Sequence, residues 1–335
     1  MSADVSAETS RGADPRLDRA RGCLLGQLAG DSLGSLVEFQ RPGEIRRLYP
    51  DGVRDLEDGG TFNTLADQPT DDSEMALALA RTLIARGTYD AEATFAAYRE
   101  WLHSGPFDCG GTIRGALMGT LNPASEANGA LMRISPLAIF GARIPVDTER
   151  HSGLEAVADW ARQDARLTHP NRVCLDANAL FTMALAHAID AGPTAEELYE
   201  WVVDWANNDA ICAEVRACVA SAADGPPDDY FTSMGWVRIA FRNALWQLLH
   251  APSLEEGVVD SVMRGGDTDT NAAICGALPG AVHGLEAVPK RWTEAILRCR
   301  PEARRPGVLR SRPKMYWPVD ALDLAAQLVA PQGRS

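Results

Sequence analysis

The sequence predicts an all-α fold, and three observations support this. Most of the chain consists of runs of good helix formers with apolar residues at helical spacing. Segments with the alternating pattern of a half-buried strand are nearly absent. No internal repeat and no convincing linker divides the 335 residues, of which 46% are hydrophobic. We therefore expect a disordered tail over residues 1–15 and a single all-α domain over residues 16–335.

The first helix is expected within residues 17–39, where leucines recur at helical spacing. Gly22, Gly26 and Gly30 recur every four residues and leave one face of this helix without side chains. Glycine costs stability in a helix, and the usual return is the close approach of another backbone. Tight helix packing and a ligand contact are both open explanations for this face.

The remaining elements follow from composition and periodicity. Residues 40–69 hold Gly, Pro and Asp without periodicity and are predicted to form a long loop. Helices are then predicted at 73–87, 90–103, 112–120, 130–140, 152–165, 172–191, 194–207, 209–221, 234–250, 254–263, 269–284, 291–299 and 319–329. Residues 221–232 are predicted to form a surface loop, and the basic residues 300–314 a solvated tail.

Composition excludes several classes of protein. The net charge of -14 argues against a surface that binds nucleic acid nonspecifically. Seven scattered cysteines without a CxxC pair are typical of free thiols in a reducing compartment. The polar start of the chain lacks the apolar run of a signal peptide, and no apolar stretch is long enough to span a membrane. We therefore expect a cytoplasmic protein that binds neither nucleic acid nor membrane.

Two short segments combine carboxylates and hydroxyls where a helix is expected to begin. They are Pro69-Thr70-Asp71-Asp72-Ser73 and, nearly 200 residues later, Gly265-Gly266-Asp267-Thr268-Asp269-Thr270-Asn271. Asp, Ser and Thr are preferred N-cap residues, so capping alone would explain either segment. Capping needs one side-chain oxygen, however, and each segment offers three or more. Oxygen clusters of this kind suit Mg²⁺, Mn²⁺ or Ca²⁺, and we expect the fold to bring both helix starts together around divalent metal.

Four further residues are candidates for a ligand site. Asp108 lies in a glycine-rich turn whose N–H groups would suit phosphate, and it is either a helix cap or a base. Arg133 ends a second glycine turn and forms either a structural ion pair or a ligand contact. His169 is either structural or catalytic, and Trp236 either packs in the core or stacks on a base. The spacings of a Walker A loop, a dinucleotide fingerprint, a Ser-His-Asp triad and a zinc site are absent.

Taken in order, these segments resemble the ADP-ribosylglycohydrolase family, which includes the dinitrogenase reductase-activating glycohydrolase and the vertebrate ADP-ribosylhydrolases. The resemblance extends from about residue 20 to residue 285. The matching segments are Gly26-Gln27-Leu28-Ala29-Gly30-Asp31-Ser32-Leu33-Gly34 with Glu38; Thr70-Asp71-Asp72-Ser73; Pro106-Phe107-Asp108-Cys109-Gly110; Asn128-Gly129-Ala130-Leu131-Met132-Arg133; Thr168-His169; Gly235-Trp236-Val237; and Gly266-Asp267-Thr268-Asp269-Thr270. The first, second and last of these are specific in combination, and the others support them.

The resemblance implies an orthogonal helical bundle with two Mg²⁺ (or Mn²⁺) ions in a cleft. The metal ligands that it implies are Thr70, Asp71, Asp72, Asp267, Asp269 and Thr270. It makes Asp108, near the scissile bond, and Glu38, near the metals, the candidate catalytic residues. The residues that it places at the substrate are Phe107, Gly110, Asn128, Gly129, Ala130, Leu131, Met132, Arg133, His169 and Trp236. Cys109 departs from the pattern, since an aliphatic residue is expected there.

Chemistry is consistent with this implication. Five carboxylates would lie in one cleft, those of Glu38, Asp71, Asp72, Asp267 and Asp269. They could not all stay ionised without compensation, and two divalent cations would nearly balance them. The implied reaction cleaves a bond from ribose C1″ to a protein side chain through an oxocarbenium-like state. Two metals can orient the ribose hydroxyls and help lower the pKa of the attacking water, with a carboxylate as acid or base.

The sequence therefore predicts a metal-dependent hydrolase that binds ADP-ribose and removes it from ADP-ribosylated proteins. The Pro-Phe-Asp-x-Gly pattern around Asp108 resembles that of bacterial enzymes acting on arginine, so ADP-ribosyl-arginine is the expected substrate. Hydrolysis of serine- or threonine-linked ADP-ribose is the alternative. A non-catalytic relative used for binding or structure, and a nucleotide phosphohydrolase that cleaves pyrophosphate, are the rivals from other classes.

Overall fold

The computed structural model describes residues 14–144, 152–207 and 210–331. Of the predicted disordered tail, residues 1–13 lie outside the described residues. Its last two residues, Asp14 and Pro15, cap and begin the first helix, because the Asp14 carboxylate accepts a hydrogen bond from the Arg16 N–H at 3.0 Å. The described residues contain fifteen α-helices and no β-strand, which confirms the all-α prediction.

The α-helices, in chain order, have the following bounds: α1 (Pro15–Gly34), α2 (Pro42–Leu48), α3 (Asp71–Arg86), α4 (Ala91–His103), α5 (Gly111–Leu117), α6 (Ser135–Gly141), α7 (Ser152–Arg166), α8 (Arg172–Ala191), α9 (Ala195–Ala206), α10 (Ala213–Ala222), α11 (Val237–His250), α12 (Leu254–Met263), α13 (Thr268–His283), α14 (Lys290–Arg298) and α15 (Ala321–Val329). Three short 3-10 helices are η1 (Leu285–Ala287), η2 (Lys314–Tyr316) and η3 (Pro318–Asp320). Every predicted helix is present, and α6, α10 and α11 begin later than predicted.

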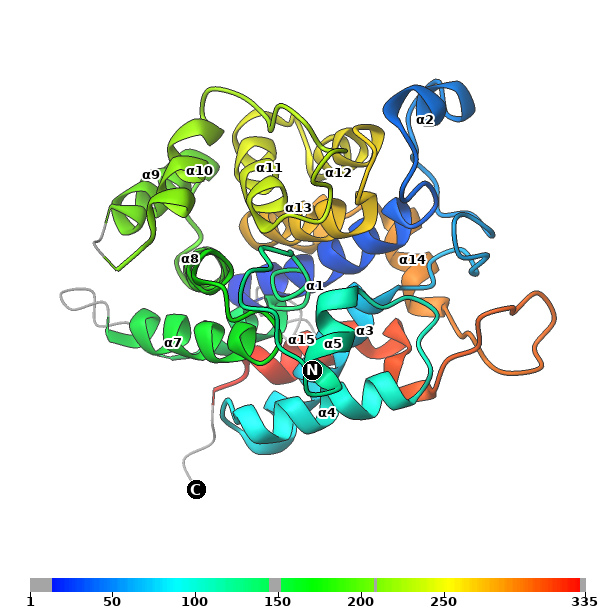
Figure 1. Ribbon diagram of the computed structural model, residues 1–335, viewed down its shortest axis with the longest axis horizontal. Helices are drawn as coiled ribbons and strands as arrows, with labels where there is room; N and C mark the ends of the chain where they lie inside the picture. The colour runs from blue at the N-terminus through cyan, green and yellow to red at the C-terminus, as the bar shows by residue number, and fades with distance from the viewer. Residues whose placement is uncertain (1–13, 145–151, 208–209, 332–335) are drawn as a thin grey trace, which may run out of the picture.

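Helices α1 and α13 lie side by side through the middle of the molecule (Figure 1), and their glycines explain how closely they pack. A Cβ atom on Gly26 would overlap the carbonyl oxygen of Gly276, and one on Gly30 would overlap that of Ala272. The four-residue glycine spacing therefore serves backbone packing, which was the first of the two explanations left open by the sequence. This packing places the end of α1 against the start of α13.

Residues 40–69 are not the uniform loop that their composition predicts, because α2 occupies part of them. A proline at its first position and a hydrogen bond from the Arg41 N–H to the Glu44 carboxylate at 3.0 Å favour a helix start there. Ile45 is the only buried residue of α2, so the sequence has no apolar periodicity from which this helix could be predicted.

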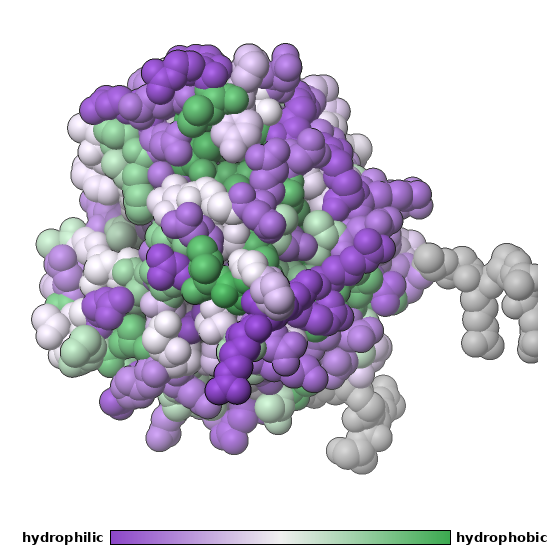
Figure 2. All heavy atoms as spheres, turned by 90° about the vertical axis from the view of Figure 1, so that its right-hand side faces the viewer, coloured by the Kyte–Doolittle hydropathy of each residue, from purple (hydrophilic) through white to green (hydrophobic). Residues whose placement is uncertain are grey.

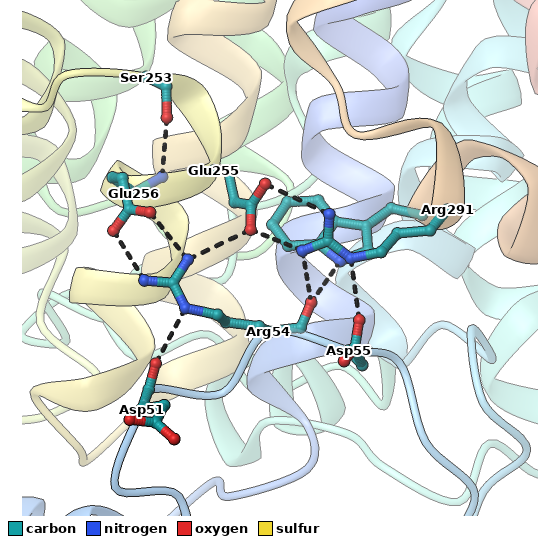
Figure 3. Close-up of polar contacts among 8 residues, drawn as sticks. Asp51, Arg54, Asp55, Ser253, Glu255, Glu256 and Arg291 are labelled. Carbon is teal, nitrogen blue, oxygen red and sulfur yellow. Dashed lines mark hydrogen bonds and ion pairs between the residues drawn. The ribbon is translucent and has the colours of Figure 1, made fainter.

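The segment after α2 is fastened by a network of charged side chains (Figure 3). Arg54 donates to both carboxylate oxygens of Glu256, at 2.8 and 3.0 Å, and to Glu255 at 3.2 Å. Arg291 joins Glu255, at 2.6 Å, to Asp55, at 2.9 Å. Each pair is partly exposed and worth little alone, but the network connects this segment to both α12 and α14.

Residues 300–314 are mostly exposed, as predicted for a solvated tail, but they are attached to the fold at buried residues. Residues 302–307 are exposed, and they lie in the loop that projects from the right of Figure 1. Hydrophilic residues cover much of that side of the molecule, with hydrophobic patches between them (Figure 2). Arg312, however, is only 5% exposed and forms an ion pair with Glu74 of α3. We call residues 300–317 the C-terminal strap.

The apolar core surrounds α8 as well as α1 and α13. Helix α8 is long and apolar enough to cross a membrane, but 89% of its most apolar window is buried inside the fold, as in a central helix of a helical domain. All seven cysteines are unpaired, and Cys109 and Cys212 are the two that are not fully buried. The prediction of free thiols is confirmed.

Candidate active site

The starts of α3 and α13 meet in the structure, although they are nearly 200 residues apart in the sequence. Asp71 and Asp72 lie in the first turn of α3, and Asp269 lies in the first turn of α13. The hydroxyls of Thr70 and Thr270, one from each segment, both lie 3.4 Å from the same carboxylate oxygen of Asp72. The two acidic segments therefore form one cluster, as the sequence predicts.

A carboxylate from α1 supports the start of α3. Asp31 is fully buried and accepts hydrogen bonds from the Thr70 N–H at 3.1 Å, the Thr70 hydroxyl at 2.8 Å and the Ser73 N–H at 3.1 Å. It thus satisfies the free N–H groups of a helix other than its own. Sequence reasoning gave Asp31 no role, although it lies in the first segment that carries the family resemblance and about two helical turns before Glu38.

Three carboxylates are close enough to share a metal ion. Glu38, Asp267 and Asp269 are buried, and each offers an oxygen within 4.8 Å of those of the other two. One oxygen of Glu38 and one of Asp72 are buried without a hydrogen-bond partner among the described residues. A buried carboxylate oxygen without a donor is costly. Carboxylates and hydroxyls are the ligands that Mg²⁺ and Mn²⁺ prefer, so these residues fit a hard divalent cation.

The electrostatics of the acidic cluster also favour a bound cation. Burial first, and then the nearby carboxylates of Asp108 and Asp267, raise the pKa of Glu38 to about 10. Burial also raises the pKa of Asp72 and of Asp269 well above the usual range, again with help from neighbouring carboxylates. The protein alone therefore supplies too little positive charge to keep these groups ionised, which a bound cation would correct.

A cavity of about 390 Å³ opens beside the acidic cluster. The predicted site residues that line it are Glu38, Asp71, Asp108, Gly110, Asn128, Gly129, Met132, His169, Asp267, Asp269 and Thr270. Burial raises the pKa of the Asp108 carboxyl above its usual range. Sequence reasoning missed several lining residues, among them Phe39, Ile113 and Met234, because apolar side chains at such positions carry no chemical signal.

Two polar side chains of the cavity wall have defined surroundings, and the first of them contacts the acidic cluster. The Asn128 amide donates to an Asp267 oxygen at 2.7 Å, which fixes the glycine turn that begins at Asn128. His169 is buried with its Nδ1 at 2.8 Å from the Thr168 hydroxyl, and its Nε2 has no partner among the described residues. Burial and the nearby Arg133 lower the pKa of His169 to about 3, so its ring is neutral.

Five of the predicted substrate residues do not line this cavity: Phe107, Ala130, Leu131, Arg133 and Trp236. Arg133 is fully buried and forms an ion pair with Asp164 at 3.1 Å, which is the structural alternative considered for it. The Phe107 ring lies 5.5 Å from that of Phe62. Trp236 is 44% exposed, so it is not a core residue, and it lines an adjacent groove of about 660 Å³.

Comparison with known proteins gives consistent relatives. The chain is 31% identical over 300 residues to the ADP-ribosyl-[dinitrogen reductase] glycohydrolase of Rhodospirillum rubrum, covering 86% of this chain and 94% of the relative. It is 28% identical to the ADP-ribosylarginine hydrolase Tri1 of Pseudomonas putida (strain GB-1), with 84% and 74% covered. It is 23% identical to human ADP-ribosylhydrolase ARH3, with 85% and 90% covered.

Comparison of the fold with solved structures finds a relative of the same kind. A solved structure titled ADP-ribosylglycohydrolase-related protein complex superimposes with a TM-score of 0.74 at 28% identity, covering 94% of this chain and 98% of the other. The family model described as ADP-ribosylglycohydrolase matches residues 12–326. This chain belongs to the ADP-ribosylglycohydrolase family.

Proposed function

We propose that this protein is a metal-dependent hydrolase that releases ADP-ribose from modified arginine side chains of proteins. One observation carries the proposal: the buried carboxylates of two distant helix starts face a single cavity, and Asp108 lies on its wall. The names of the Rhodospirillum and Pseudomonas relatives, a glycohydrolase of ADP-ribosyl-dinitrogen reductase and an ADP-ribosylarginine hydrolase, support it. The unpaired cysteines fit a reducing compartment, and we propose the cytoplasm as its location.

The cofactor in this proposal is a pair of Mg²⁺ or Mn²⁺ ions. The residues that would hold them are Thr70, Asp71, Asp72, Asp267, Asp269 and Thr270, with Glu38 beside them. Such ions bind ribose hydroxyls and lower the pKa of bound water, which makes hydroxide available near neutral pH.

The protein's own groups would bind and orient the substrate. The turn that leads into α5 lines the cavity at Cys109, Gly110 and Gly111, where its backbone would lie beside an anionic diphosphate, and the cavity wall adds the neutral ring of His169. Gly129, packed against Ile113 and the His169 ring, leaves no space for a side chain at that part of the wall. The substrate is thereby held with the bond to be broken near Asp108.

Asp108 is then the group that moves the proton. The bond from ribose C1″ to the guanidine nitrogen breaks, the sugar gains oxocarbenium character, and the leaving nitrogen takes a proton from a carboxylic acid. Asp108 can donate that proton because burial keeps its carboxyl protonated to a higher pH than usual. Water adds to C1″, and the resulting carboxylate of Asp108, or that of Glu38, takes up the proton that the water releases.

The test compares two matched peptides that carry ADP-ribose on arginine or on serine, at equal concentration with Mg²⁺. We expect free ADP-ribose to be released faster from the arginine peptide. Faster release from the serine peptide would contradict the arginine preference and leave a hydrolase of O-linked ADP-ribose. Release of AMP would indicate a phosphohydrolase, and binding of ADP-ribose without any release would indicate a non-catalytic relative.

A further inference from the structure

The loop that carries Asp108 is fixed at both ends. Helix α4 ends at His103 and α5 begins at Gly111, so residues 104–110 connect them. At the far end, the Gly110 N–H donates to the Asp71 carboxylate at 3.2 Å. At the near end, Ser104 is bound by Arg312 of the C-terminal strap, over 200 residues later in the chain. Asp108 lies between these two points.

Arg312 uses its whole guanidinium group in this contact. It donates to the two Glu74 oxygens at 2.6 and 2.7 Å, to the Ser104 carbonyl at 3.1 Å and to the Ser104 hydroxyl at 2.8 Å. The side chains of Arg312 and Glu74 are each only 2% exposed. The Trp101 indole of α4 also donates to Glu74, at 2.7 Å. A lysine ammonium could replace the charge of Arg312 but not this planar set of donors.

The strap is itself held in register. The Arg312 N–H donates to the Pro301 carbonyl at 2.9 Å, and the Trp317 indole donates to the Arg312 carbonyl at 2.8 Å. Two residues before Arg312, the Arg310 carbonyl accepts a hydrogen bond from the Gln68 side chain at 2.6 Å. The Arg310 side chain donates to the Phe62 carbonyl at 2.8 Å. The strap thus contacts the segment that leads into α3 as well as the Asp108 loop.

We propose that Arg312 is a positioning residue for Asp108. Glu74 lies in the same helical turn as Asp71 and Asp72, so Arg312 connects the acidic start of α3 to the first residue of the Asp108 loop. It thereby sets where the Asp108 carboxyl stands relative to the cluster that would hold metal. This inference rests on the proposed function for the role of Asp108, but the contacts themselves do not.

Two matched variants test it. Arg312→Lys keeps the charge and loses the contact geometry. Arg81→Lys is the control. Arg81 lies on α3 and forms a comparable two-fold contact with a carboxylate, that of Asp320, at 2.8 and 2.9 Å. It also donates to the Met315 carbonyl of the strap, at 2.8 Å, but among the described residues it has no hydrogen bond to the Asp108 loop.

The first measurement is hydrogen exchange of residues 104–110, which needs no substrate. We expect faster exchange in Arg312→Lys than in the wild type and in Arg81→Lys. Unchanged exchange would overturn the proposal. If Arg312→Lys does not fold, Ser104→Ala carries the same test, because it removes the hydroxyl that Arg312 contacts at 2.8 Å, together with that hydroxyl's hydrogen bond to the Trp101 carbonyl at 2.6 Å. Wild-type exchange in that variant would equally overturn the proposal.

The second measurement is ADP-ribose release from the arginine-modified peptide. We expect kcat of Arg312→Lys to fall by about tenfold to hundredfold, because small displacements of a catalytic group are that costly, with the Kd of ADP-ribose within about threefold of the wild type. Adding Arg312→Lys to Asp108→Asn should have little further effect on kcat. Fully additive losses would mean a merely structural role and overturn the proposal. If the wild type releases no ADP-ribose, the proposed function fails and the exchange result still decides the role of Arg312.

Discussion

Two carboxylic acids in the cavity could move a proton, and their surroundings distinguish them. Glu38 has an oxygen within 4.8 Å of oxygens of Asp267 and Asp269, so a cation bound by these two residues would also contact Glu38. Asp108 is outside that trio and sits on a loop at the cavity wall. Burial raises the pKa of both groups. We therefore favour Asp108 as the acid and base and Glu38 as a neighbour of the metals.

Replacing Asp108 by asparagine tests this assignment. Asp108→Asn keeps the shape and removes the proton donor, so turnover should fall by roughly 10² to 10⁴, the usual worth of general acid–base catalysis. ADP-ribose should still bind, as measured by calorimetry. Asp204→Asn, on the exposed side of α9, is the matched control and should turn over like the wild type. Wild-type turnover in Asp108→Asn would make Glu38 the leading candidate.

At the scale of helices, the sequence predicted the features that depend on neighbouring residues and missed those that depend on distant ones. The starts of α3 and α13 were predictable because capping residues and helix formers adjoin in the sequence. Helix α2 was missed because it buries only Ile45. Arg312 was assigned to a tail because its partner, Glu74, is 238 residues away. No pattern within a helix or loop can indicate such a pair, and the Arg133–Asp164 pair was left open for the same reason.

The packing of α1 on α13 gives a prediction at this scale. A Cβ on Gly26 would overlap the backbone carbonyl of Gly276, which cannot rotate away. Gly26→Ala should therefore destabilise the fold by about 1–3 kcal/mol, the range for overpacked cores. Gly43→Ala is the control: Gly43 is exposed in α2 with no atom near its Cβ position, so this change should be neutral or stabilising by up to about 1 kcal/mol. Urea unfolding followed by tryptophan fluorescence measures both, and equal stabilities would show that the two helices can separate to admit a methyl group.

For the whole molecule, the acidic cluster is a destabilising feature that a cation would reverse. Burial raises the pKa of Asp31 to about 6 and that of Glu38 to about 10, and it raises those of Asp71, Asp72 and Asp269 well above the usual range. A carboxyl whose pKa is raised by folding stabilises the fold fully below its ordinary pKa of about 4, and this contribution is lost as the pH rises through the raised pKa. Without metal, the site should therefore lose stability from about pH 4 upwards, through pH 6 and towards pH 10.

A divalent cation should act in the opposite direction, because it binds ionised carboxylates and binds them in the native state only. We expect Mg²⁺ or Mn²⁺ to raise the melting temperature relative to EDTA, and to raise it more at pH 8 than at pH 5.5. The readout is this difference between metal-loaded and metal-free protein, since the net charge of -14 affects both alike. Asp269→Ala should abolish the difference, because Asp269 belongs to the carboxylate trio at the start of α13. Identical melting curves with EDTA and with either metal at both pH values would show that the cluster does not bind metal, whatever reaction the cavity supports.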